Sequence, residues 1–299
     1  MARRVAAVSL ACLLAAGHPP PLRLEAARAA GCAAHAARGP SRGPSRGPWP
    51  RSPKPEDVAR VMAELTRRLS GATPPARITV PIWVHIITAG ARRVSDQDVA
   101  AQIKALNSAY GGGYGGVDTG VRFKLEGVTV DENALWFADP IGNERPMKAK
   151  LHRGDATTLN LYIAQLSEQM LGFASYPFWY AESPGLDGVV IDWRSLPGGP
   201  MAEYNRGFTG VHEVGHWLGL FHPFENGCAA PGDGIDDTPM EAGPTEGCPP
   251  AKDTCTNPGT DPTRNFMDYA YDRCMSEFTR AQAERMHEMW AVYRHATSA

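Results

Sequence analysis

Five residues within one eleven-residue stretch of this sequence could bind and use a metal ion. The stretch HEVGHWLGLFH places Glu213 directly after His212, then His216 and Gly219, and ends at His222. Two histidines four apart on a helix project from the same face, so their imidazoles can share one ion. Gly219 can adopt a backbone conformation that other residues resist, so the helix can stop there and turn His222 back toward that ion. The spacing predicts three ligands for one zinc ion.

Three histidine ligands indicate a catalytic zinc site rather than a structural one. Three neutral imidazoles leave the fourth tetrahedral position open for water, whereas the protein fills all four positions in a structural site. Glu213 adjoins the first ligand and is placed to take a proton from that water, as general base, instead of binding the metal. The alternative is a set of ordinary histidines on a half-buried helix, and five specified positions in one stretch disfavour it.

The elements that must position these residues are predicted from capping and periodicity. Ser95 with Asp98 forms a capping box that opens a helix, and Thr279 with Gln282 caps a closing helix. Alternating or β-branched apolar runs predict the strands, and apolar residues at helical spacing predict the helices. Residues 223–265 are rich in Gly, Pro, Asp and Thr and show no regular period. The expected strands are 78–87, 121–130, 159–163 and 188–193. Besides the helix that opens at Ser95, the expected helices are 56–69, 211–218 and the closing helix 280–293.

The N-terminal quarter of the sequence predicts targeting and processing segments. Two arginines followed by an apolar run over 5–16 and then three prolines are typical of a secretory signal peptide, residues 1–17. A membrane helix is the alternative, but about a dozen apolar residues cannot cross a bilayer core that needs about 20. The repeat RGPSRGPSRGPWP at 38–50 is a linker that cannot bury a core. We therefore expect a prosegment and linker over 18–75 and the main domain over 76–299.

The composition of the chain excludes some partners. Its 30 Lys and Arg against 32 Asp and Glu give a net charge of −2, which leaves no electrostatic footprint for nucleic acid or an anionic membrane. No segment after the signal is apolar for long enough to span a bilayer. We expect a soluble, secreted, extracellular protein.

Four of the six cysteines crowd into one region, residues 228–274. They are separated by 20, 7 and 19 positions, and no Cys-x-x-Cys pair of the kind found in zinc fingers occurs among them. Clustered cysteines in a secreted chain indicate two disulfides, for which sequence alone allows three pairings. The four are Cys228, Cys248, Cys255 and Cys274.

The metal-binding stretch and several other motifs resemble one protease family. The stretch matches the zinc signature of the metzincins, which also carry a tight turn with a methionine beneath the metal. Asn-Phe-Met-Asp-Tyr at 265–269 resembles that turn. More specifically, the chain resembles the pappalysin-like metzincins, or cytophagalysins, including their secreted members. The resemblance runs from about residue 151 to the C-terminus and includes the segments LNLY at 159–162, DGVV at 187–190, DDTP at 236–239 and DRC at 272–274. Thr-Gly-Val at 209–211 departs from the family pattern before the first ligand.

The resemblance implies a fold and an activity. The fold would be an α+β metzincin-type domain, with a twisted mixed sheet and two long helices above the cleft and an irregular, disulfide-tied lower part ending in a helix. The activity would be zinc-dependent endopeptidase hydrolysis, by zinc-activated water with Glu213 as general base. An extended peptide would pair with an edge strand supplied by residues 187–193. Two other functions stay open. One is a secreted binding module in which zinc is structural, and the other is zinc-dependent hydrolysis of something other than peptides.

The resemblance also assigns individual residues. Met267 would form the floor of the site, and Tyr269 would stabilise the oxyanion. Asp272 would lie in the pocket that receives the side chain just beyond the scissile bond, and would favour arginine there. Cys32 would keep the precursor latent by placing its thiolate on zinc. The disulfides would be Cys228–Cys255 and Cys248–Cys274, and calcium would bind a loop that includes Asp233, Asp236, Asp237 and Thr238. We expect a monomer that acts on protein or peptide substrates.

Overall fold

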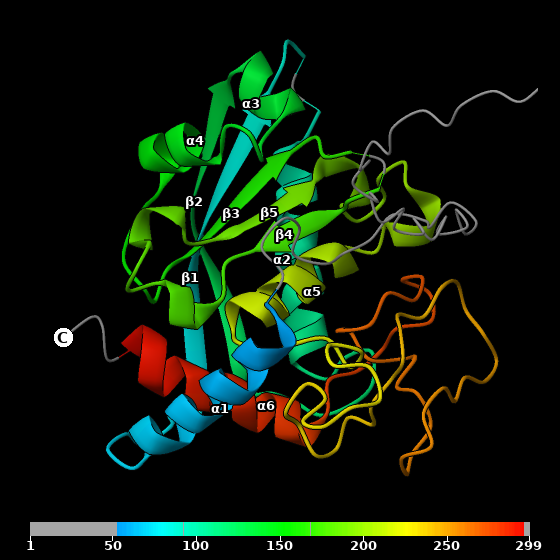
Figure 1. Cartoon of the computed structure of the whole chain (residues 1–299). Coiled ribbons are helices and arrows are strands. Elements are labelled where there is room, and N and C mark those ends of the chain that lie inside the picture. The colour runs from blue at the N-terminus through cyan, green and yellow to red at the C-terminus, as the bar shows by residue number, and fades with distance from the viewer. Residues whose placement is uncertain (1–52, 92, 168, 296–299) are drawn as a thin grey trace, which may run out of the picture. The chain divides into compact units, whose positions relative to one another are not determined.

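Strands and helices alternate through the first two thirds of the structure, a computed structural model that describes residues 53–91, 93–167 and 169–295 (Figure 1). All the elements predicted above are present, together with several that were not predicted. The longer elements are α1 (Pro55–Leu69), β1 (Ile78–Thr88), α2 (Asp96–Tyr110), β2 (Val121–Glu132), α3 (Ala134–Ala138), α4 (Glu144–Leu151), β3 (Leu159–Ala164), β4 (Gly172–Ala174), β5 (Val189–Asp192), α5 (Phe208–Trp217) and α6 (Arg280–Met289). Four short 3₁₀ helices are η1 (Pro177–Trp179), η2 (Pro184–Leu186), η3 (Trp193–Ser195) and η4 (Ala202–Tyr204).

A five-stranded sheet in the order β2-β1-β3-β5-β4 is the centre of the fold. The first four strands are parallel, and β4 pairs antiparallel with β5. Successive residues of a strand face opposite sides of the sheet. Leu161 and Val189 thus join the core beneath α2 and α5, whereas Tyr162 and Val190 join a second core beneath α3 and α4. This mixed sheet with helices on both faces confirms the predicted α+β class.

The edge of the sheet on the side of the predicted metal site is β4, not the strand expected from sequence. The prediction that residues 187–193 supply the edge strand is wrong, because β5 lies between β3 and β4. β4 is only three residues long, so it has no apolar period that a sequence could reveal. β4 runs antiparallel to β5, so a short connection after β3 can lead into it, and it forms the outer strand next to β5.

Helix α5 carries the predicted metal ligands and is buried along its whole length. It begins at Phe208, three residues earlier than predicted, after Gly207 in the left-handed conformation with φ of 79°. The predicted capping boxes are both present, Ser95 with Asp98 at α2 and Thr279 with Gln282 at α6. A lone glycine is a weaker start signal than these boxes, which explains the misplaced start of α5.

The irregular lower part of the fold is held by disulfides and by the partly buried side chain of Lys252. Cys228 is bonded to Cys255 and Cys248 to Cys274, the pairing that the resemblance implies. Lys252 reaches inward to Glu241, to the carbonyl of Gly243 and to the Thr245 hydroxyl, with Asp261 Oδ2 3.5 Å from Nζ. The loops of residues 223–265 therefore depend on cross-links where other regions have a hydrophobic core.

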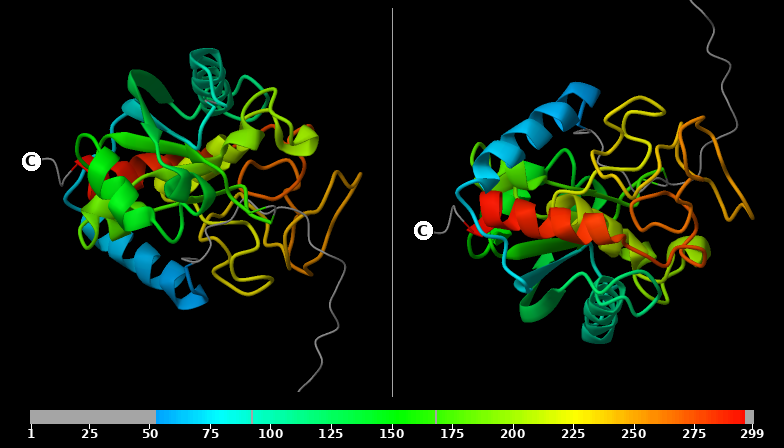
Figure 2. Two further views of the ribbon diagram at one scale, coloured as in Figure 1. Left: turned by 90° about the horizontal axis from the view of Figure 1, so that it is seen from above. Right: turned by 90° about the horizontal axis from the view of Figure 1, so that it is seen from below.

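The last helix and α1 lie side by side against the lower side of the sheet domain (Figure 2). α6 continues as a π-helix, η5 (Trp290–His295), where one regular helix over 280–293 was expected. Arg294 of η5 is fully buried, 3.1 Å from Asp187 Oδ2, and donates two hydrogen bonds to the carbonyl of Trp217 at the end of α5. The C-terminal segment is thus tied to the helix that carries the site. No helix in the described ranges is long and apolar enough to cross a membrane.

Candidate active site

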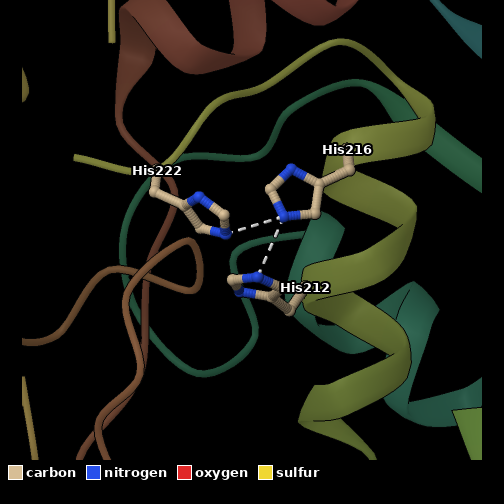
Figure 3. Close-up of side chains that lie close together, drawn as sticks. All are labelled: His212, His216 and His222. Atoms are coloured by element: carbon tan, nitrogen blue, oxygen red, sulfur yellow. Dashed lines mark hydrogen bonds between the residues drawn. The ribbon is translucent and has the colours of Figure 1, made fainter. Parts of the chain in front are cut away.

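The three histidines of the sequence motif converge on one point (Figure 3). His212 and His216 project from one face of α5, and Gly219, with φ of 97°, ends the helix and returns the chain so that His222 faces them. Nε2 of His216 lies 3.0 Å from Nε2 of His212 and 3.0 Å from Nε2 of His222. Within the described ranges they form the only group of three or more His, Cys, Asp or Glu side chains that could hold an ion.

The opposite ring nitrogens fix the tautomer of each histidine. Nδ1 of His212 lies 2.7 Å from the carbonyl oxygen of Phe266, and Nδ1 of His216 lies 2.7 Å from that of Leu220. Nδ1 of His222 faces the Glu225 carboxylate at 2.8 Å. Because these partners can only accept, each Nδ1 carries the proton and each Nε2 presents a lone pair.

Three lone pairs facing one another need a cation between them, and zinc fits. Tetrahedral zinc with bonds of about 2.0–2.1 Å holds its nitrogen ligands about 3.3 Å apart, close to the separations found here. Burial lowers the pKa of His216 well below its ordinary value, which keeps the imidazole neutral as a ligand must be. The donor set is therefore that of a zinc site with three protein ligands.

Glu213 lies beside the histidines, completely buried, and packs against the edge strand. A methyl group built on Gly172 of β4 would lie 2.6 Å from Glu213 Cγ and 2.8 Å from its Oε1. Glycine is therefore required at this position, because any side chain there would displace the carboxylate. The importance of Gly172 could not be read from the sequence, where it is one glycine among 31.

The tight turn after residue 264 brings Met267 against α5 and Tyr269 beside His222. Met267 is fully buried, and its sulfur lies so close to Gly215 of α5 that a methyl group on Gly215 would overlap it. The Tyr269 hydroxyl lies 3.3 Å from Nε2 of His222. Methionine thus supports the ligand helix from below, and the tyrosine hydroxyl reaches the predicted metal position.

Asp272 is 1 % exposed and its segment is anchored on both sides. Its Oδ2 accepts a hydrogen bond of 2.7 Å from the backbone N–H of Arg206, and its own N–H donates to the carbonyl of Glu203 at 3.0 Å. Cys274, two residues on, is fixed by its disulfide to Cys248. The segment that carries Asp272 is therefore held by two backbone hydrogen bonds and a nearby disulfide.

The four residues of the predicted calcium loop do not all meet at one place. Asp233 is buried, and its Oδ2 lies 2.7 Å from the Thr238 hydroxyl, which also lies 3.0 Å from the Ile235 carbonyl oxygen. Asp237 instead accepts from the Thr279 hydroxyl and the Ala281 N–H at the start of α6. Asp236 is exposed. The structure thus separates Asp233 with Thr238 from Asp237, which caps a helix.

Two residues that support the histidines were not predicted from the sequence. Glu225 orients His222 as described above, and the hydroxyl of Tyr176, after β4, lies 2.9 Å from Nδ1 of His216. Glu225 follows His222 by three positions, a spacing at which side chains in a turn commonly meet, so it could have been found. Tyr176 is 40 residues from its partner, and no local pattern connects them.

Comparisons with a family model and with known proteins agree on one family. A family model described as pregnancy-associated plasma protein-A matches residues 150–291. An extracellular metalloprotease of Arthroderma benhamiae is 38% identical over 237 residues, which cover 76% of this chain and 76% of that protein. Extracellular metalloprotease 1 of Coccidioides posadasii is 37% identical over 81% of this chain and 88% of its own. The chain belongs to the pappalysin-like metzincin family.

Solved structures of this pappalysin-like family extend the similarity to the fold. Mature mirolysin of Tannerella forsythia, in complex with a cleaved peptide, superposes with a TM-score of 0.63 at 29% identity, over 75% of this chain and 98% of that one. A promirolysin mutant gives a TM-score of 0.70 at 28% identity, over 80% and 91%. The chain is therefore a metallopeptidase of extracellular type, and its family uses zinc. Cys32, the signal peptide and most of the expected prosegment lie outside the described residues.

Proposed function

We propose that this pappalysin-like metallopeptidase is a zinc endopeptidase with His212, His216 and His222 as ligands and Glu213 as general base. The observation that carries the proposal is the convergence of three Nε2 lone pairs beside a buried carboxylate. A structural zinc site has no use for an uncoordinated carboxylate next to an open position, so a secreted binding module fits less well. Casein cleavage by the processed protein, with and without a zinc chelator, tests the proposal, and no cleavage by zinc-loaded protein would favour the binding module.

The described side chains suit each part of peptide hydrolysis. Zinc bound by the three histidines would polarise the attacking water and the scissile carbonyl. Glu213 accepts the proton of the water and later donates it to the leaving amine. The Tyr269 hydroxyl, next to His222, donates a hydrogen bond to the oxygen on which negative charge develops. Met267 and the three Nδ1 contacts keep the ligands fixed, so little reorganisation is needed during reaction.

The edge strand β4 offers a template for an extended substrate. An extended peptide adds to a sheet by pairing with its outermost strand. β4 occupies that place, and its Gly172 touches Glu213, so a peptide paired there passes directly over the proposed base. Mirolysin, a structural neighbour, has been captured with a cleaved peptide. Both observations support a peptide substrate over another class of molecule.

Asp272 supports a preference for arginine on the C-terminal side of the cut. A buried carboxylate pairs best with a guanidinium through two hydrogen bonds. In a digest of a mixed peptide library, we expect Asp272→Asn to reduce the excess of arginine at this position by about tenfold, since it removes the charge and keeps an acceptor for the Arg206 N–H. Glu246→Gln is the matched control, because Glu246 is exposed in the same lower part. Apolar residues at this position in the unaltered enzyme's cuts would contradict the assignment.

Calcium binding stays a proposal, centred on Asp233 and Thr238. The Thr238 hydroxyl oxygen lies near both Asp233 Oδ2 and the Ile235 carbonyl oxygen. Its single hydrogen cannot satisfy both of these acceptors fully. Burial raises the pKa of Asp233 to about 7 despite hydrogen bonds from Thr238 and the Ile235 N–H and the nearby charge of Arg285, and a bound cation would further favour the charged form.

The calcium proposal predicts a stability that depends on pH. Without calcium, the folded state holds a proton on Asp233 that the unfolded state has lost, so the free energy of unfolding should fall as pH rises through 7. Asp233→Asn should remove this fall. At pH 8, calcium should raise the melting temperature of the unaltered protein and leave that of Asp233→Asn unchanged. An equal calcium response in both proteins would place the ion elsewhere.

Three further expectations stay predictions. They are the prosegment and linker over 18–75, latency through the Cys32 thiolate, and a monomeric enzyme.

A further inference from the structure

Helix α1 lies in the expected prosegment, yet its apolar side is part of the core behind the metal ligands. Val58, Val61 and Leu65 are 0–2 % exposed and pack in one cluster with Tyr176 and Phe221. Residues of α6 and η5 complete the cluster: Met289, Val292 and Tyr293. Removal of this segment would leave its own apolar partners in α6, η5 and the Tyr176 segment facing water, which is unfavourable.

Polar contacts add to this apolar packing. Arg68 donates a hydrogen bond of 2.7 Å to the carbonyl of Val292, and its guanidinium lies 4.6 Å from the centre of the Tyr293 ring. At the start of α1 the Asp57 carboxylate accepts a hydrogen bond of 2.9 Å from the backbone N–H of Lys54, so the N-terminus of the helix is capped within the described residues. The helix is thus built as part of the same compact unit as the sheet and the metal ligands.

The cluster beneath α1 reaches the metal site through two aromatic side chains. Tyr176 is fully buried, stacks on Phe221 at 5.3 Å, and places its hydroxyl 2.9 Å from Nδ1 of His216. Nδ1 carries one hydrogen, which is shared between the Leu220 carbonyl and the tyrosine oxygen, so the tyrosine is a second acceptor that restricts the rotation of the ring. Phe221 lies between Leu220 and His222 in the chain, so the same cluster also holds the turn that returns the third ligand.

We propose that Tyr176 is a positioning residue for His216, and that α1 holds it in place and remains in the active protease. The boundary of the working enzyme then lies ahead of Pro55 rather than at residue 76. The proposal rests on the proposed role of His216 as a zinc ligand. It assigns α1 to the catalytic domain and confines the removable part to residues before it.

Two measurements on the secreted, processed protein test the proposal. N-terminal sequencing of the active form should give a first residue no later than Pro55. Tyr176→Phe, which removes only the hydroxyl, should weaken zinc binding about tenfold in competition with a chelating dye, since such supporting contacts contribute 10–100-fold to metal affinity. Its kcat at saturating zinc should change much less. The matched control is Tyr162→Phe, which removes another fully buried hydroxyl, in the second core.

A third variant examines α1 without touching the site. Val61→Asp in the full chain should reduce zinc affinity as Tyr176→Phe does, and a folded form that starts at Ala76 should show the same defect. Either of two results would overturn the inference. One is a zinc affinity of Tyr176→Phe within twofold of that of the unaltered protein. The other is an active form that starts beyond Leu69 and binds zinc with full affinity. An unaltered protein that binds no zinc or cleaves no peptide would instead refute the proposed function, so the two failures are distinguishable.

Discussion

Glu213→Ala should keep one zinc ion per chain and hydrolyse peptides about 10³-fold more slowly than the unaltered enzyme. The substitution removes the group that accepts and returns the proton, and it touches none of the three ligands, whose Nδ1 atoms are held by Phe266, Leu220 and Glu225. The loss should appear in kcat rather than KM, because the carboxylate acts on the water in the transition state. Metal analysis and a fluorogenic peptide assay measure both quantities.

Two controls make this result specific to proton transfer. Glu213→Gln keeps the shape of the side chain against Gly172 and should be as slow as the alanine variant. His216→Ala should lose zinc together with activity. If Glu213→Ala retained a tenth of the unaltered rate, another group would be the base, and if it lost zinc, the carboxylate would have a role in metal binding that the proposal does not include.

Gly172→Ala should lower kcat/KM about 100-fold with zinc still bound. The added methyl group would meet Glu213 at 2.6–2.8 Å, so either the carboxylate or strand β4 must move. Displacement of a catalytic group by about 1 Å is enough to cost about two orders of magnitude in rate. The assay is peptide hydrolysis at saturating zinc, with melting temperature measured to show that the sheet remains folded.

The matched control for this variant is Gly185→Ala. A methyl group at Gly185 meets nothing within 4 Å, and the residue has no left-handed conformation to lose. A double variant separates the two ways in which Gly172→Ala could act. If it acts by moving Glu213, it should add little to the defect of Glu213→Ala, whereas an additive loss would mean that the substrate's pairing with β4 is what suffers.

The parts of the fold that sequence predicted are those with a local signal. The four longer strands have alternating or β-branched residues, and α2 and α6 have capping boxes that occur in the structure as expected. β4 is too short to show a period, and α3 and α4 together span only 13 residues. These three elements form through contacts with the rest of the sheet domain, so their positions depend on tertiary packing rather than on local sequence.

The same distinction holds for the site. The ligands lie within eleven residues of one another, and a helix followed by a glycine turn is sufficient to bring them together. Tyr176 and Gly172 come from the edge strand and the segment after it, 40 and 41 residues before the residues they touch. Only the crossing of β4 over α5 makes them neighbours. Asp272 was found through the family resemblance, and its bond to the Arg206 backbone became visible only in the structure.

The cross-links of the lower part fail under different conditions. A reducing agent opens both disulfides and leaves the Lys252 contacts intact. Acid has the opposite effect. Burial and the nearby Asp268 raise the pKa of Glu241 to about 7. Mild acidity therefore neutralises the carboxylate paired with Lys252 and leaves the disulfides unaffected. The lower part of the fold thus keeps one kind of cross-link under either condition.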